Sequence, residues 1–391
     1  MKFGADAILV HGLSQNIINI FHGIISSFGS NSIIVKAAQK DENVREFQKT
    51  LSASIIILFC LSGLVSAVFI VVPDILYSIN LLSLDQINLY GQYINLLPVC
   101  FIMGGVGVIF ISVANGLQRN MLVIFSNIFS VSISGLICLW LIYSSSITVA
   151  WAFPIYVGLI GLFQVVFVLP EFIRNIEFDK PEVKNFIYLA KMASMPIASA
   201  ILTPLTMIYI RQSMVDVDVS GAQKWEILRI ISNIFSSLLI SYFSLVMIPR
   251  LAKMKNMKDI IECKLQNILS MSIVFFPTAI GIFLFSDFVY YVIAGDLIKP
   301  TGVELITKIV GEYIRVLNWV LSLFLLPLLM TRIYILTSFF YAVIHISLTY
   351  VLLNLFQYNP VLLQNAAYFI SNLLFLCYLI WLLKHKREER W

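Results

Sequence analysis

Long apolar runs recur along the whole chain, and they constrain its fold more than any other feature. A membrane-spanning helix needs roughly 20 mostly apolar residues to cross a hydrocarbon core of about 30 Å. Eleven stretches meet this requirement, and we predict helical spans at 7–34, 51–73, 89–115, 121–143, 147–170, 187–210, 225–248, 266–293, 304–330, 333–356 and 361–383. The sequence therefore predicts an all-α polytopic membrane protein.

Composition excludes a soluble protein. Of the 391 residues, 60% are hydrophobic and 12% are charged, whereas soluble domains carry about 25% charged residues. The connections between the predicted spans are too short for a soluble catalytic domain, and Walker A and HExxH motifs are missing. The five cysteines form no metal-ligand spacing. We therefore expect no enzyme, no catalytic residues and no metal site.

Basic residues in the connections predict the orientation of the chain. They gather in 36–49, 171–186, 249–265 and the C-terminal tail, and the connections between these carry few or none. Because cytoplasmic connections hold the excess of Lys and Arg, these four segments are expected in the cytoplasm. The C-terminus then lies inside the cell and, with eleven spans, the N-terminus lies outside.

The charged connection 171–186 divides the predicted spans into five before it and six after it. We expect two pseudo-symmetric bundles: an N-terminal helical bundle at 1–170 and a C-terminal helical bundle at 187–391. Residues 171–186 would form a cytoplasmic linker between them.

The predicted span 304–330 begins with charged residues that lipid disfavours. Lys308, Glu312 and Arg315 are spaced to lie on one helical face. A charge at the bilayer centre costs roughly 2.5–3.5 kcal/mol, so such side chains normally face a partner or a water-filled cavity. We expect Lys308 to snorkel toward the outer membrane surface. For Glu312 and Arg315 we favour a cavity-facing position over an interfacial ion pair.

A second group of charges lies around the span 225–248. Arg229, Ser232 and Ser236 share a helical face, with Glu226 nearer the outer end. Arg211 ends the preceding span, and it fits an interfacial anchor as well as a substrate ligand. The deep charges are net positive, so a cleft that they line would attract anions, and arginine suits phosphate through its bidentate fork.

The first predicted span carries a neutral polar stripe. Its members are His11, Gln15, Asn19, His22 and Ser26. We expect the stripe to line the same aqueous cleft from the N-terminal half. For the two histidines a hydrogen-bonding role is favoured over a proton-carrying one.

Several motifs occur in an order and at separations that resemble a known transporter family. They are FGADAILVHG at 3–12, IIVKAAQ at 33–39, WEILRIISN at 225–233, LVMIPRLAK at 245–253, VGEYIRVLNW at 310–319 and RIYIL at 332–336. The chain resembles the Wzx-type flippases of the MOP (MATE-like) superfamily, in particular the branch for O-antigen and enterobacterial common antigen (lipid III). Those proteins move undecaprenyl-diphosphate-linked oligosaccharides across a membrane.

The resemblance implies a flippase that carries its substrate from the cytoplasmic to the periplasmic leaflet of the bacterial inner membrane by alternating access. Coupling to H⁺ or Na⁺, contact with membrane lipid, and partnership with a polysaccharide polymerase and a chain-length regulator of lipopolysaccharide biosynthesis would follow. No cofactor and no nucleic acid is implied. The substrate-binding cations would be Arg229, Arg315, Arg211 and Lys36. The coupling or polar cleft residues would be Glu312, Glu226, Ser232, Asn233, Gln15, Asn19 and His22.

The sequence departs from the family pattern in two places. The family has twelve helices, so its first helix is expected to be missing from the eleven spans predicted here. Pro327 and Leu328 also stand where the family has Ala-Lys.

Other functions stay open beside the flippase. One is a degenerate or truncated relative without transport activity, and another is a MATE-like cation-coupled antiporter. An antiporter would want carboxylates in its cleft, whereas the deep charges here are net basic. A membrane polymerase or ligase for the same glycans would need longer external loops than the predicted spans leave.

Overall fold

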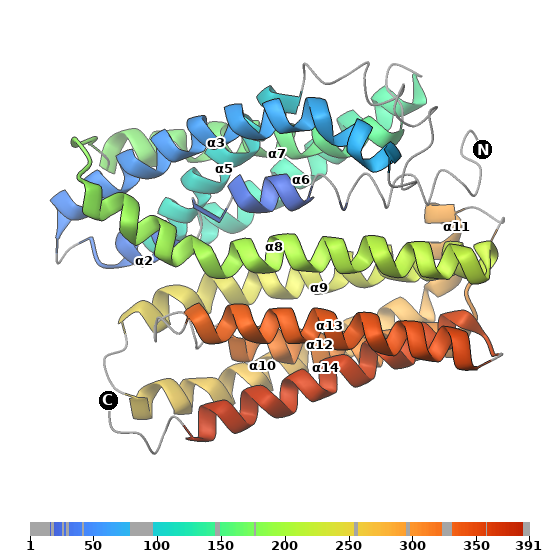
Figure 1. Ribbon diagram of the computed structural model, residues 1–391. Coiled ribbons are helices and arrows are strands. Elements are labelled where there is room, and N and C mark those ends of the chain that lie inside the picture. The colour runs from blue at the N-terminus through green and yellow to red at the C-terminus, as the bar shows by residue number, and fades with distance from the viewer. Residues whose placement is uncertain are drawn as a thin grey trace. The chain divides into compact units, whose positions relative to one another are not determined.

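The computed structural model describes residues 16, 19–25, 27–28, 31–40, 43–78, 97–144, 149–175, 177–253, 257–294, 298–322, 331–356 and 358–385. Within these ranges every regular element is an α-helix (Figure 1). This confirms the predicted all-α fold class. The chain divides into two compact units, an N-terminal unit of residues 14–201 and a C-terminal unit that contains residues 202–391.

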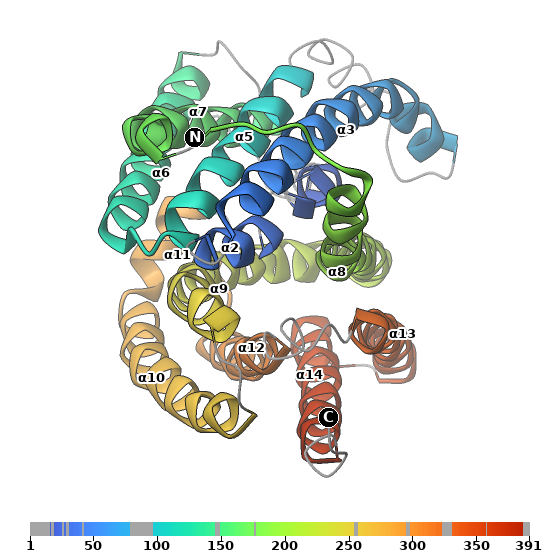
Figure 2. The same cartoon turned by 90° about the vertical axis from the view of Figure 1, so that its left-hand side faces the viewer.

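The N-terminal unit is held together by close helix packing. Its helices are α2 (Asn31–Ala38), α3 (Val44–Ser78), α5 (Leu97–Gly116), α6 (Asn120–Tyr143), α7 (Val149–Asn175) and the first part of α8 (Val183–Val217). α5 and α7 lie side by side in Figures 1 and 2. A Cβ on Gly107 of α5 would lie 2.5 Å from Cα of Gly161 on α7. These glycines let the two backbones touch, as small residues do between helices in membranes.

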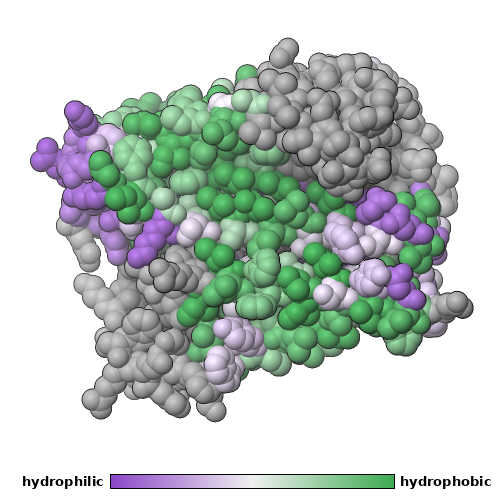
Figure 3. Space-filling model, in the orientation of Figure 1, coloured by the Kyte–Doolittle hydropathy of each residue, from purple (hydrophilic) through white to green (hydrophobic). Residues whose placement is uncertain are grey.

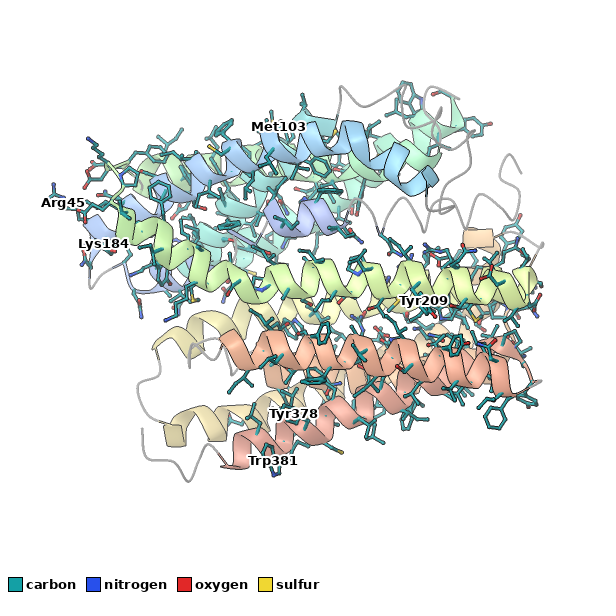
Figure 4. The ribbon with its side chains drawn as sticks, viewed as in Figure 1. Arg45, Met103, Lys184, Tyr209, Tyr378 and Trp381 are labelled. Carbon is teal, nitrogen blue, oxygen red and sulfur yellow. The ribbon has the colours of Figure 1, made fainter. Side chains whose placement is uncertain are left out.

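Charged side chains tie the starts of α3 and α8 together at one end of the N-terminal unit. Arg45 Nε donates to Asp179 at 2.9 Å, and Lys184 lies 3.2 Å from Glu46. Asn185 adds a hydrogen bond to Glu46 at 3.0 Å. Figure 4 labels Arg45 and Lys184 at this end. The segment before α8 is therefore fixed by ion pairs, most of them solvent-exposed.

The C-terminal unit packs its remaining helices around α12. These helices are the rest of α8, α9 (Val219–Lys253), α10 (Met257–Leu284), α11 (Ser286–Ala294), α12 (Gly302–Ser322), α13 (Thr331–Leu355) and α14 (Pro360–His385). In the end-on view of Figure 2, α12 lies beside α9, α10 and α14. Trp225 of α9 is fully buried in an apolar cluster with Ile210 and Leu305. These three neighbours enclose one side of α12.

The starts of α12 and α14 are fixed to each other by capping. The backbone N–H of Thr301 donates to Glu304 Oε2 at 2.7 Å, and the N–H of Glu304 donates to Thr301 Oγ1 at 3.3 Å. This is the reciprocal capping box of a helix N-terminus. Asn359 caps α14 by accepting from the N–H of Val361 at 2.9 Å, and its amide donates to Glu304 Oε1 at 2.8 Å. The shared caps set the register in which the two helices face each other.

Two of the predicted span boundaries are wrong. The expected connection 211–224 is helical except at Asp218, because α8 and α9 each have 35 residues. At about 1.5 Å per residue such helices exceed a hydrocarbon core of about 30 Å and continue past the apolar run. The expected span 266–293 is two helices that meet at Phe285. Ser286 and Asp287 follow this break, and such residues favour helix starts over helix interiors.

The outer sides of the helices are apolar. Within the described ranges seven helices are long and apolar enough to cross a membrane, and α12 is not one of them. Figure 3 shows hydrophobic residues along the helix sides and hydrophilic ones toward the ends. Near the C-terminal end of α14, Tyr378 and Trp381 are exposed with ring centroids 5.9 Å apart (Figure 4). Such aromatic residues typically mark the membrane–water interface.

Candidate functional site

The polar side of α12 faces the interior of the C-terminal unit, and its apolar side faces outward. Glu304, Lys308 and Glu312 are all at least 96% buried, with exposures of 0%, 4% and 1%. Val303 and Val310, on the other side, are 60% and 46% exposed. This inverted arrangement is the one expected of a helix that meets lipid on one side and polar groups of its own bundle on the other.

Glu312 is the centre of one charged cluster. Arg315 Nε donates to Glu312 Oε1 at 2.7 Å, and the Arg315 guanidinium also reaches Ser236 Oγ on α9. Tyr368 of α14 donates its hydroxyl to Glu312 Oε2 at 2.7 Å. The Arg315 side chain is 32% exposed, whereas Glu312 is buried. We call Lys308, Glu312, Arg315 and Tyr368 the Glu312 cluster.

Lys308 does not snorkel, and that prediction is wrong. Its ammonium lies 3.9 Å from the ring centroid of Tyr368, inside the unit. The electron-rich face of an aromatic ring attracts a cation, the more so where water is excluded. The contact with α14 therefore turns Lys308 inward, and the sequence of α12 alone does not predict this orientation.

Glu226 is the centre of a second cluster, between α8 and α9. Arg211 Nη2 donates to Glu226 Oε2 at 3.0 Å, and Arg229 Nε donates to Glu226 Oε1 at 2.9 Å. The exposed fractions of the three side chains are 6%, 0% and 5%. The interpretation of Arg211 as an interfacial anchor is wrong, because its guanidinium is buried against a carboxylate. We call Arg211, Glu226 and Arg229 the Glu226 cluster.

The predicted polar face of α9 is confirmed, and it joins the two clusters. Ser232 Oγ donates to the backbone oxygen of Arg229 at 3.1 Å, and Ser236 Oγ donates to that of Ser232 at 2.7 Å. Both serines are buried. Because Ser236 also contacts Arg315, the face leads from the Glu226 cluster to the Glu312 cluster. Four basic side chains and two carboxylates meet here, so the network is net positive.

A polar side of α14, which the sequence analysis missed, completes the network. Asn318 of α12 donates to the backbone oxygen of Asn372 at 2.8 Å. Thr349 of α13 donates to Gln364 Oε1 at 2.8 Å, and Gln364 Nε2 lies 3.1 Å from Nε2 of the buried His345. A signal for this side exists in QNAAYFISN, where the polar residues recur at helical spacing. These are Gln364, Asn365, Tyr368, Ser371 and Asn372.

The remaining predicted site residues lie apart from this network or outside the described ranges. Lys36 is in the last turn of α2, not in a connection, and its ammonium lies 4.8 Å from the ring centroid of Tyr188 in the N-terminal unit. Asn19 and His22 are half-buried in a helical stretch of the same unit, and Asn233 is half-buried on α9. Gln15, with His11, lies outside the described residues.

The donor groups of the network suit an anion better than a metal ion. In the described part of the chain, His, Cys, Asp and Glu side chains nowhere gather in threes as metal ligands do. Guanidinium and ammonium groups are donors without acceptor capacity, and arginine matches the oxygens of phosphate and carboxylate. What the network can do is hold negative oxygens inside a membrane-embedded unit.

Solved structures of transporters resemble this chain along nearly its whole length. An inward-facing MATE family multidrug resistance transporter of the MOP superfamily is 13% identical, with TM-score 0.66, over 99% of this chain and 95% of that one. An outward-facing one is 12% identical, with TM-score 0.74, over 98% and 88%. The chain has the fold of the MATE transporters. No protein-family model and no curated protein matches the sequence.

A third solved structure shares this fold and is described by its electrostatics. It is a MOP superfamily transporter from Pyrococcus furiosus whose binding pocket has reverse polarity, which suggests a different function for it. It is 11% identical, with TM-score 0.70, over 97% of this chain and 88% of that one. Identity at this level carries the fold of these proteins over to this chain, and nothing of their substrates.

Proposed function

We propose that this protein is a membrane transporter that moves a lipid-linked, anionic headgroup by alternating access, and that it is not an enzyme. The substrate is an undecaprenyl-diphosphate-linked oligosaccharide of the O-antigen or enterobacterial-common-antigen type, carried from the cytoplasmic to the periplasmic leaflet. The observation that carries the proposal is the buried, net positive network of the C-terminal unit. A cation-rich interior in a helical membrane bundle calls for an anion as its ligand.

The charge of the network fits the headgroup for a physical reason. A diphosphate cannot enter hydrocarbon without compensation, because transfer of an unpaired charge from water costs many kcal/mol. Arginine offsets that cost with charge-assisted hydrogen bonds. Arg315, one third exposed, is the side chain that we assign to the headgroup first. The polyprenyl tail stays in lipid while the headgroup passes through the bundle.

The other predicted cations enter the proposal in a supporting role. Arg211 and Arg229 add to the positive field, although both already pair with Glu226. Lys36, whose ammonium lies against Tyr188, stays a candidate substrate contact of the N-terminal unit. Glu226 and Glu312 are the candidate sites for coupling to H⁺ or Na⁺.

The solved relatives support the transport part of the proposal. Inward-facing and outward-facing conformations are known for MATE transporters of this fold, which is the pair of states that alternating access requires. The reverse polarity of the pocket in the Pyrococcus furiosus transporter shows that the fold accommodates different pocket charges. A net basic interior in this chain therefore favours a substrate other than a cationic drug.

A location and partners follow from the proposal. The protein would lie in the bacterial inner membrane with its C-terminus in the cytoplasm. The tail KHKREERW holds four Lys and Arg residues, and cytoplasmic segments carry the excess of these. A polysaccharide polymerase and a chain-length regulator would act on the exported unit. Protease protection of a C-terminal tag in sealed spheroplasts tests the orientation, and cleavage from outside would contradict it.

A second candidate function is a MATE-like cation-coupled antiporter. The observation in its favour is the fold shared with multidrug resistance transporters. Buried Glu226 and Glu312 would then serve the cationic substrate directly. Efflux of cationic dyes from cells that express the protein separates the two candidates, because the flippase predicts none.

The flippase proposal is tested by rescue of glycan export. A strain that lacks its own flippase receives wild type, Arg315→Ala, Arg229→Ala or the control Lys299→Ala, and lipid-linked sugar is scored on the periplasmic side. Lys299 is a half-exposed lysine near α11, so its loss should be silent. Wild type and control should restore export, and Arg315→Ala should not. Full export by both arginine variants at equal protein levels would contradict the charged-cleft mechanism, and failure of wild type across several glycan types would favour a non-transporting relative.

A further inference from the structure

Lys308 differs from the other buried basic side chains of the network because its ammonium contacts an aromatic ring and not a carboxylate. The side chain is 4% exposed, and its ammonium lies 3.9 Å from the centroid of Tyr368. Among the residues that the structure describes, no Asp or Glu forms an ion pair with Lys308. Glu312, one turn away, acts on it electrostatically, but both of its oxygens are taken by Arg315 and Tyr368.

An ammonium in this position has donors left over. Lysine carries three N–H donors and no acceptor, and a ring face attracts the charge without acting as a full acceptor. Burial of a charge whose hydrogen bonds are not made is costly, so a native structure keeps one where a ligand completes it. A group rich in negative oxygens would accept from these donors.

We propose that Lys308 and Arg315 together form an oxyanion site for phosphate or diphosphate, with Tyr368 as the residue that positions both. The two cations are seven residues apart on α12, so they lie on the same side about two turns from each other. Tyr368 orients the pair, since its ring faces Lys308 and its hydroxyl holds Glu312 against Arg315. This inference rests on the proposed function and extends it to a residue that sequence analysis assigned to the membrane surface.

The Glu226 cluster has a structural role. Arg211 and Arg229 share one buried carboxylate, and their guanidinium groups are engaged by it. They hold α8 to α9 and contribute field, while direct contact with the anion falls to α12. Substitution of Lys308 should therefore weaken anion binding directly.

Phosphate oxygens occur both in lipid headgroups and in free anions, and the choice of probe separates these sources. The purified full chain in detergent is titrated with inorganic diphosphate and, separately, with geranylgeranyl diphosphate, while the thermal unfolding midpoint is followed. Ligand that binds the folded state raises the midpoint with concentration. A lipid-headgroup site predicts that the prenylated probe stabilises at lower concentration than the inorganic one, and a free-anion site predicts the reverse order or equality.

Four variants decide the assignment of Lys308. Lys308→Met removes the charge at similar length and should weaken diphosphate binding at least about 30-fold, as loss of a buried charge contact does. Lys308→Arg keeps the charge and should stay within about tenfold of wild type. Tyr368→Phe keeps the ring under Lys308 and loses only the hydroxyl that holds Glu312, so its affinity should not fall as that of Lys308→Met does. Lys299→Met is the matched control and should bind as wild type does.

The outcomes are distinguishable. Wild-type affinity in Lys308→Met overturns the site at Lys308 and leaves the proposed function in place. Absence of binding by wild type to both probes overturns the proposed function and this site with it. Weak binding in Lys308→Met, with an unfolding midpoint near that of wild type in the absence of ligand, establishes the site when Lys299→Met and Lys308→Arg still bind.

Discussion

The Glu226 cluster and the Glu312 cluster each have a buried glutamate at the centre but differ in whether every basic side chain pairs with it. In the first, two arginines close on one carboxylate, and all three side chains are at most 6% exposed. In the second, Glu312 pairs with Arg315, whose side chain is 32% exposed, and the ammonium of Lys308 lies over the ring of Tyr368. Each cluster carries one positive charge in excess, so the difference lies in the contacts: a buried basic residue is a ligand candidate when no carboxylate of its own protein accepts its hydrogen bonds.

The two clusters should also differ in what they contribute to folding. A buried ion pair that loses one partner leaves a charge without compensation, which costs far more than the pair contributes. In the Glu226 cluster, removal of any one of the three side chains would carry this cost. The Glu312 cluster can lose Lys308 without leaving a carboxylate unpaired, because Arg315 and Tyr368 still hold Glu312.

The largest expected effect is that of Glu226→Gln. Two buried guanidinium groups would lose their shared carboxylate, and the free energy of unfolding should fall by about 3–5 kcal/mol. Chemical unfolding of the purified protein in detergent measures it. The control Asp287→Asn changes the charge equally at an exposed residue, 3.7 Å from Lys299, and should be silent. Equal stability of the two variants would show that the Glu226 cluster is not closed.

The next effect concerns the packing that supports the Glu312 cluster. A Cβ on Gly311 would lie 2.8 Å from Cδ1 of Tyr368, so Gly311→Ala should push α14 away from α12. Such overpacking typically costs about 1–3 kcal/mol. At Gly281 of α10 a Cβ would meet nothing within 4 Å, so Gly281→Ala should be neutral or slightly stabilising through helix propensity. Denaturant midpoints that fall equally for both variants would contradict the close approach.

A smaller effect on stability is expected from Lys308→Met. Its free energy of unfolding should lie within about 1 kcal/mol of wild type, because replacement of a buried charge by an apolar side chain removes a desolvation cost. Arg229→Met, at the closed cluster, should lose about 3–5 kcal/mol, since Glu226 is left with one partner fewer. Equal losses in the two variants would make Lys308 an ordinary structural cation.

The smallest effect belongs to the exposed ion pairs of the N-terminal unit. The hydrogen bond from Arg45 holds the pKa of Asp179 below its ordinary value. A carboxylate with a lowered pKa in the folded state stabilises the protein above its unfolded pKa, and the contribution disappears as the pH falls through the folded pKa. Asp179→Asn should thus be slightly less stable than wild type at neutral pH and equal to it in acid. High salt should also abolish the difference, and a difference that persists in both conditions would refute the pairing.

Sequence periodicity was sufficient for the elements but not for the orientation of their polar sides. Apolar runs predicted the helices and the all-α class, and spacing alone predicted the buried face of Arg229, Ser232 and Ser236. Spacing also placed Glu312 with Arg315. Which of these side chains pair with one another was not predictable, because the pairing depends on contacts between helices far apart in sequence.

Lys308 shows why the contacts between helices could not be predicted from the sequence. Near the start of a helix, a lysine has two low-cost positions, and snorkelling to the surface is the more common one. The aromatic ring that draws it inward belongs to Tyr368 on α14, 60 residues later. Arg211 is a similar case, since its partner Glu226 lies across a turn at Asp218 that the span boundaries did not anticipate. The polar spacing within QNAAYFISN is the one local signal that pointed to α14.

The measurement that tests the account most directly is the affinity of Glu312→Gln for diphosphate. Glu312 competes with an incoming anion for Arg315, so its neutralisation should free the guanidinium and tighten binding by about tenfold or more relative to wild type. Asp287→Asn, with the same change in net charge at an exposed residue, should leave the affinity unchanged. Weaker or unchanged binding by Glu312→Gln, in protein that remains folded, would contradict the claim that this cluster presents its positive charge to an anion.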